Sequence, residues 1–152
     1  MVAKHNLIKS FDITGEEFRE VNLPDCFARK SIFNLPMSKL RESVLVLERG
    51  VEDNNPVIYV WMMQDDVPKT FTKLFSVNSN TPDALLVYVR GFRKTGEPII
   101  EIVKKVFGTG ELAVYEPYSK HIHNYGIIGS YFSFIVSSYM ETLLLIDQPD
   151  PK

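Results

Sequence analysis

The amino-acid sequence predicts an all-β fold built from repeated units. Three observations support this expectation. The apolar runs are short and rich in β-branched and aromatic residues, clusters of Gly, Pro, Asn and Asp separate them, and one pattern of strand, turn and strand returns along the chain. The chain has 152 residues, 45% of them hydrophobic, which is enough for one domain with an apolar core. Aromatic residues make up 12% of the chain and are spread along it, which fits several small sheets better than one helical bundle.

The predicted strands follow the apolar runs in order, and the turns between them carry Gly, Pro, Asn or Asp. The stretches "GVEDNNP", "NSNTPD", "RKTGEP", "FGTGE" and "EPYSK" are turn-like linkers. The expected strands are Leu7–Asp12, Glu17–Val21, Ser43–Glu48, Val57–Met63, Thr70–Ser76, Ala84–Gly91, Ile99–Val106, Glu111–Glu116, His121–Tyr125, Ser133–Val136 and Thr142–Asp147.

One of these runs also fits a helix. In "IIEIVKKVF" the residues Ile99, Ile102, Val103 and Val106 have the i, i+3, i+4, i+7 spacing of a helix face. The run is short, β-branched and flanked by glycines, and these features favour a strand. We therefore predict a strand, with a helix as the alternative.

A repeat connects distant parts of the chain. When "IKSFDITGEEFREV" is laid on "LAVYEPYSKHIHNY", Phe11 falls on Tyr115, and a looser copy between them places Trp61 in the same position. Fifty residues separate Phe11 from Trp61, and 54 separate Trp61 from Tyr115. The other matched positions are Ile8 with Ile58 and Leu112, Asp12 with Glu116, Phe18 with Ile122, and Val21 with Tyr125.

A period near 50 residues, with about four short strands per unit, is typical of kelch-type propeller blades. A blade buries its faces only against neighbouring blades, so each unit needs the same apolar positions. Phe11, Trp61 and Tyr115 are expected to be wedges between blades. Closed propellers typically have four to eight blades, so the chain is predicted to be a partial kelch-like β-propeller of about three four-stranded blades. It would occupy residues 1–148, followed by a frayed tail at 149–152.

Composition argues against several classes of partner. The net charge of −2 and the pI near 5.9 give no overall attraction to nucleic acid or to an acidic membrane. Cys26 is the single cysteine, so no intrachain disulfide can form, and a reducing compartment is the simpler expectation. The N-terminal stretch has no apolar run of signal-peptide length. We expect a cytoplasmic or nuclear protein.

The pair His121 and His123 is the strongest metal candidate. At i, i+2 on a strand both imidazoles point to one face and could reach one metal ion. The sequence supplies no third ligand nearby, since Cys26 and His5 are far away along the chain. We therefore predict no metal and no cofactor.

The other candidate groups are expected to be structural. The acid pairs Asp65-Asp66 and Glu16-Glu17 flank turns, where carboxylates cap backbone groups. "FGTGEL", with Gly108 and Gly110, lacks a phosphate-binding pattern and is expected to be a hairpin turn. Cys26 has Arg29 and Lys30 nearby, which could activate its thiol, although an incidental thiol is favoured. Arg90, Arg93 and Lys94 are expected to form a basic hairpin tip. No catalytic residue is predicted, and the protein is not expected to be an enzyme.

Four stretches carry a resemblance to a known family: "IKSFDITGEEFREVNLP", "VIYVWMM" with "VPKTFTKLFSV", "ELAVYEPYSKHIHNYGI" and "YMETLLLID". Together they resemble the plant F-box-associated domain, the kelch-like C-terminal region of plant F-box proteins. The resemblance runs over nearly all of residues 7–149. Phe71 departs from it, because the family often has Trp at that position.

This resemblance implies a non-catalytic module that recruits protein substrates to an SCF-type ubiquitin ligase. The stretch "LPMSKLRESVLVL" from Leu35 imitates the start of an F-box, but the turn "EDNNP" follows, so we predict a loop and a strand there. The chain is thus expected to be truncated and unable to bind the ligase adaptor by itself. Two alternatives stay open: a decoy that binds partners without docking the adaptor, and an enzyme on a propeller scaffold. Partner-binding residues are not predicted; the loops expected to vary are Cys26–Leu40, Gly50–Pro56, Gln64–Lys69 and Ser76–Asp83.

Overall fold

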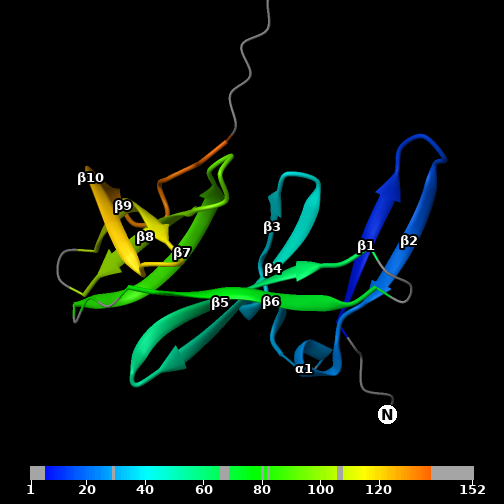
Figure 1. The fold of residues 1–152 in the computed structure, drawn as a ribbon, viewed down its shortest axis with the longest axis horizontal. Helices are drawn as coiled ribbons and strands as arrows, with labels where there is room; N and C mark the ends of the chain where they lie inside the picture. The colour runs from blue at the N-terminus through cyan, green and yellow to red at the C-terminus, as the bar shows by residue number, and fades with distance from the viewer. Residues whose placement is uncertain are drawn as a thin grey trace, which may run out of the picture.

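In the computed structural model, which describes residues 6–28, 30–65, 69–79, 81, 83–105 and 108–137, the chain folds into three antiparallel sheets (Figure 1). The first sheet is a hairpin of β1 (Leu7–Asp12) and β2 (Glu17–Asn22). The second sheet has the order β3 (Met37–Leu40), β4 (Ser43–Glu52), β5 (Asn55–Met63) and β6 (Phe71–Asn78). The third sheet has the order β7 (Ala84–Phe92), β8 (Pro98–Lys104), β9 (Thr109–Glu116) and β10 (His121–Ser130). Between β2 and β3 lie the short helix α1 (Asp25–Ala28) and the 3-10 turn η1 (Ile32–Asn34).

The all-β expectation is confirmed, and the predicted strands up to β10 are present with shifted ends. The expectation of four strands in every sheet is wrong for the first sheet, which has two strands in the described part of the chain. The interpretation of residues 26–40 as a loop is also wrong at its end, because β3 forms there. Met37–Leu40 is only four residues long and contains no β-branched residue, so it lacks the composition that identifies a strand.

The C-terminal part departs from the prediction as well. Ser133–Val136 is described but is not a strand. After β10 the backbone turns sharply, with Phe132 at a φ of 64° and the Ser133 N–H donating to the Ser130 carbonyl. The predicted strand Thr142–Asp147 and the tail at 149–152 lie outside the described residues.

The ambiguous run around Ile99 is a strand, as predicted. β8 pairs on both sides, with β7 and with β9, so its backbone groups are satisfied by the sheet. Ile100 and Ile102 are buried on one face, while Glu101 and Val103 are buried on the other. A central strand covered on both faces is apolar throughout, and this explains why its sequence also matches a helix pattern.

The main core lies between the second and third sheets. Alternate residues of β4, β5 and β6 meet alternate residues of β7, β8 and β9, because successive side chains of a strand point to opposite faces. Each such aliphatic side chain contributes about 1.5–3 kcal/mol when it is fully buried. The buried members are Leu45, Leu47, Ile58, Val60, Val77, Ala84, Val87, Ile100, Ile102, Ala113 and Tyr115.

A smaller core connects the first and second sheets. Phe27 of α1 is fully buried and meets the rings of Trp61 and Phe71 edge-on, with centroids 5.2 Å and 6.3 Å away. Ile8 of β1 and Val46 of β4 belong to the same cluster. The hairpin therefore reaches the second sheet through the segment that contains α1.

The three repeated aromatic residues occupy corresponding strands. Phe11 is in β1, Trp61 is in β5 and Tyr115 is in β9, and each of these strands pairs with the last strand of its sheet. Tyr115 lies in the core toward the second sheet, and Trp61 packs in the smaller core toward the first sheet. Phe11 is 50% exposed, and its ring contacts that of Phe18 with centroids 4.8 Å apart. The expectation that Phe11 is a wedge between two sheets is therefore wrong.

These positions predict different costs for the same truncation. Tyr115→Ala and Trp61→Ala should each lower the free energy of unfolding by about 3–5 kcal/mol, because a fully buried ring is lost at Tyr115 and a partly buried ring that packs on Phe27 is lost at Trp61. Phe11→Ala should cost about 1 kcal/mol or less, since half of that ring already faces water. Urea unfolding followed by circular dichroism measures all three variants, because Trp61 is the single tryptophan and its removal abolishes the fluorescence signal. Equal costs at the three positions would contradict this packing.

Candidate functional site

Turns of the second and third sheets meet at one end of the molecule. β3 and β7 both run toward this end, and the turns that follow them, at residues 41–42 and 93–97, return to β4 and β8. The turn between β9 and β10, at residues 117–120, lies at the same end, because β9 has the direction of β7. Such turns are held by rigid strands and expose their side chains to partners.

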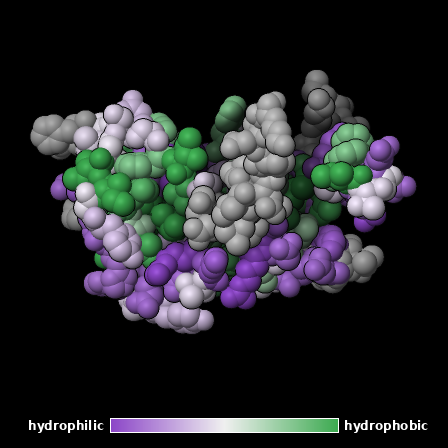
Figure 2. All heavy atoms as spheres, turned by 90° about the horizontal axis from the view of Figure 1, so that it is seen from above, coloured by the Kyte–Doolittle hydropathy of each residue, from purple (hydrophilic) through white to green (hydrophobic). Residues whose placement is uncertain are grey.

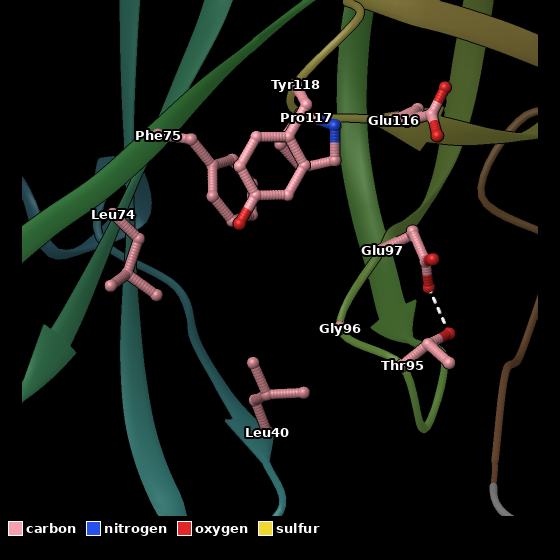
Figure 3. A pocket seen from close by; sticks show the side chains of 9 residues that line it. All are labelled: Leu40, Leu74, Phe75, Thr95, Gly96, Glu97, Glu116, Pro117 and Tyr118. Atoms are coloured by element: carbon pink, nitrogen blue, oxygen red, sulfur yellow. Dashed lines mark hydrogen bonds between the residues drawn. The ribbon is translucent and has the colours of Figure 1, made fainter.

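The turns at residues 93–97 and 117–120, together with residues of β3 and β6, enclose a pocket of about 400 Å³ (Figure 3). This volume lies in the ordinary range for ligand sites, roughly 300–1,000 Å³. The second sheet contributes apolar side chains from β3 and β6, and the third sheet contributes two carboxylates and an aromatic rim. The lining residues used below are Leu40, Leu74, Phe75, Glu97, Glu116 and Tyr118. We call this the end pocket.

Tyr118 is the most accessible large side chain of the end pocket. Its ring is fully exposed, with a relative accessibility of 101%, and Leu74 across the pocket is 38% exposed. Figure 3 shows Tyr118 and Phe75 among the side chains that line the pocket. An exposed tyrosine beside an apolar hollow is a typical anchor for a protein partner.

Hydrogen bonds hold the two carboxylates at the other wall. The Thr95 hydroxyl donates to the Glu97 carboxylate, and this bond lowers the pKa of Glu97, with Arg93 adding a smaller electrostatic contribution. The Ser119 hydroxyl donates to the Glu116 carboxylate. The end pocket therefore presents an apolar wall and an acidic wall at neutral pH.

The histidine pair is close together, as the strand spacing predicts. The rings of His121 and His123 on β10 have centroids 4.5 Å apart. Among the described residues, no group of three or more His, Cys, Asp or Glu side chains is arranged to hold a metal ion. The pair does not line the end pocket.

The remaining candidates lie apart from one another. Asp65 is exposed and pairs with Lys69 at 2.8 Å, whereas Asp66 lies outside the described residues. Glu16 sits in the turn of the first sheet and Glu17 begins β2. Cys26 on α1 is exposed.

Lys30 does not serve the Cys26 thiol, because its ammonium group pairs with Glu48. Arg29 lies outside the described residues. Gly108 is in a turn, with a φ of 59°, as expected, but Gly110 belongs to β9. Arg93 and Lys94 are at the predicted hairpin tip, while Arg90 is part-buried in β7.

Two buried carboxylates were not predicted from the sequence. Glu101 is fully buried in β8 and accepts hydrogen bonds from the Arg90 guanidinium, with Nε at 2.6 Å, and from the Phe132 N–H at 2.9 Å. Glu48 in β4 pairs with Lys30 and accepts from the Trp61 indole N–H at 2.9 Å. The only available signal was a lone acid inside an apolar strand, as in "IIEIV" and "LVLER".

Both carboxylates act as structural connectors. Glu101 ties β7, β8 and the segment after β10 together, and Gly110 of β9 packs directly under it with no room for a Cβ. The ion pair between Glu48 and Lys30 connects the second sheet to the segment that follows α1. Because each carboxylate is fully paired, neither is available for acid–base chemistry.

Glu101 also provides a stability prediction. Glu101→Gln should lower the free energy of unfolding by about 3 kcal/mol or more, because Arg90 would be left part-buried without its counter-charge. Glu42→Gln is the matched control: it breaks the exposed Lys39–Glu42 pair at 3.4 Å and should leave stability unchanged. Chemical denaturation at pH 7 compares the two variants, and similar stabilities for both would contradict this role of Glu101.

Comparison of the chain with protein-family models, with curated proteins and with solved structures finds no match. In the part of the chain that the structure describes, no helix is both long and apolar enough to cross a membrane.

Proposed function

We propose that this chain is the partner-recognition module of an SCF-type ubiquitin ligase receptor and performs no catalysis itself. In this proposal, its sheets are blades of a kelch-like β-propeller. The observation that best supports a binding role is the end pocket, with the fully exposed Tyr118 at its rim. The ligase context comes from the resemblance of the sequence to the plant F-box-associated domain.

Two features support the propeller. The second and third sheets are four-stranded, antiparallel and packed face to face. Trp61 and Tyr115 occupy the third strand of their sheets, and each packs toward the sheet that precedes it. The blades of a propeller are repeated sheets that pack on one another through residues at equivalent positions.

The stretch from Leu35 bears on how the module would join a ligase. It consists of a short loop, β3, a two-residue turn and β4, so it is a hairpin and not a pair of helices. An F-box docks its adaptor through helices. The hairpin supports the expectation that this stretch is a loop and a strand and not an F-box.

The proposal is tested with a photo-crosslinking amino acid in place of Tyr118. We expect it to capture a specific protein in cells, whereas the same probe in place of Lys105, which follows the end of β8 opposite to the end pocket, should not capture it. When an F-box is fused ahead of the chain, the captured protein should become ubiquitinated and short-lived. In the F-box fusion, Tyr118→Ala should reduce the ubiquitination and the degradation rate of the captured protein at least about fivefold. The stability of the chain should not change, because the ring makes a contact only in the complex.

Two results would refute the proposal. One is efficient binding of the purified chain, without the added F-box, to the ligase adaptor. The other is a captured protein whose level and ubiquitination do not respond to the F-box fusion, which would leave a binding module with no link to a ligase.

A further inference from the structure

A second hollow, distinct from the end pocket, lies between the edge strands β3 and β7. Its volume is about 760 Å³, and it shares only Leu40 with the end pocket. β3 and β7 are each the last strand on one side of their sheet, and they contact one another across this hollow. We call it the edge groove.

Five basic side chains line the edge groove, and no acidic side chain lines it. Lys39 and Arg41 come from β3 and its turn, and Arg90, Arg93 and Lys94 come from β7 and its turn. The sequence places these two groups about fifty residues apart, so only the fold brings them together. This is a local positive site on a chain whose net charge is −2.

The neighbouring acids neutralise only part of this charge. Glu101 pairs with Arg90, Glu42 pairs loosely with Lys39 at 3.4 Å, and Glu97 lies close enough to Arg93 for its pKa to respond. Arg41 and Lys94 are exposed and form no ion pair with the described residues. At least two positive charges are therefore available to a ligand.

The edge strands determine which kind of anion fits. Val136, from the segment after β10, also lines the groove and lies against Gly91 of β7, so it covers part of the β7 edge. An edge strand presents unpaired backbone N–H and C=O groups, and an extended peptide can pair with those of β3 as an added strand. Phe92 and Ile99 supply apolar surface beside the charges. A peptide with acidic side chains at alternate positions would match both the backbone groups and the cations, because alternate side chains point the same way.

We propose that the edge groove binds an extended acidic segment of a partner protein, which pairs with the edge of β3 and places carboxylates against Arg41 and Lys94. This inference does not depend on the ligase assignment, since it follows from the groove alone. A membrane or a nucleic acid fits less well, because the chain is acidic overall and the positive site is short.

The probe is a fluorescein-labelled decapeptide of alternating Glu and Thr, with binding followed by fluorescence anisotropy at low and high salt. We expect saturable binding that weakens with salt, and weaker binding of the matching Gln-Thr peptide. Methylation of alternate backbone nitrogens of the Glu-Thr peptide should also weaken binding, because it removes the donors that pair with the edge strand.

The decisive variant is Arg41→Gln/Lys94→Gln, and its control is Lys105→Gln/Lys120→Gln, which removes the same charge from exposed residues that line neither hollow. The first should raise the dissociation constant about tenfold, and the second should leave it nearly unchanged. Both should fold normally, as circular dichroism can verify, since all four side chains are exposed.

Three results would overturn the proposal. The first is equal binding of the Glu-Thr and Gln-Thr peptides. The second is an equal loss of binding in the two double variants, which would reflect net charge and not the groove. The third is tighter binding of a ten-nucleotide oligo-dT than of the peptide, which would assign the groove to nucleic acid.

Discussion

The packing of the second sheet against the third is the interaction on which the rest of the structure depends. Leu45, Val60 and Val77 on one side, and Ile100 and Ala113 on the other, are almost completely removed from water. This core fixes the distance between β3 and β7 and between β6 and the turn after β9. Both hollows described above exist because these two sheets are held together.

Hydrophobic side chains are exposed on the first and third sheets, which lie at the two ends of the stack. Figure 2 shows hydrophobic residues gathered at both ends of the molecule, over the third sheet and over the hairpin of β1 and β2. Phe11 and Phe18 are exposed at the hairpin, and Ile127 and Ile128 are exposed on β10. Of the residues that correspond to Phe11, Tyr115 is buried against the second sheet, and Trp61 is partly buried against Phe27 of α1. The same repeat thus yields buried and exposed positions according to whether a sheet precedes it.

Local composition predicted most of the strands because their patterns depend on near neighbours in the sequence. The turns after β7 and β9 and the strand β8 were predictable for this reason. β3 was not predicted, because four residues without a β-branched side chain do not have the composition of a strand. The packing of Phe27 against Trp61 was not predictable either, because it depends on contact between segments that are distant in the sequence. The repeat pointed correctly to corresponding strands, but it could not reveal that the first sheet has two strands where the others have four.

The sites were less predictable than the fold. Arg90, Arg93 and Lys94 could be recognised as a basic cluster, but their meeting with Lys39 and Arg41 depends on contact between strands far apart in sequence. Tyr118 was part of an expected turn, and nothing in the turn itself indicates that Leu74 and Phe75 lie opposite. A charged residue in an apolar strand, such as Glu101, was the one overlooked local signal of a buried ion pair.

Native-state hydrogen exchange tests most directly whether the two four-stranded sheets are one cooperative unit. We expect the amides of β4, β5, β8 and β9 to exchange slowest and with the same opening free energy, because neither sheet keeps its core without the other. The hairpin of β1 and β2 should open at lower cost. Clearly different opening free energies for β4–β5 and β8–β9 would contradict the shared core.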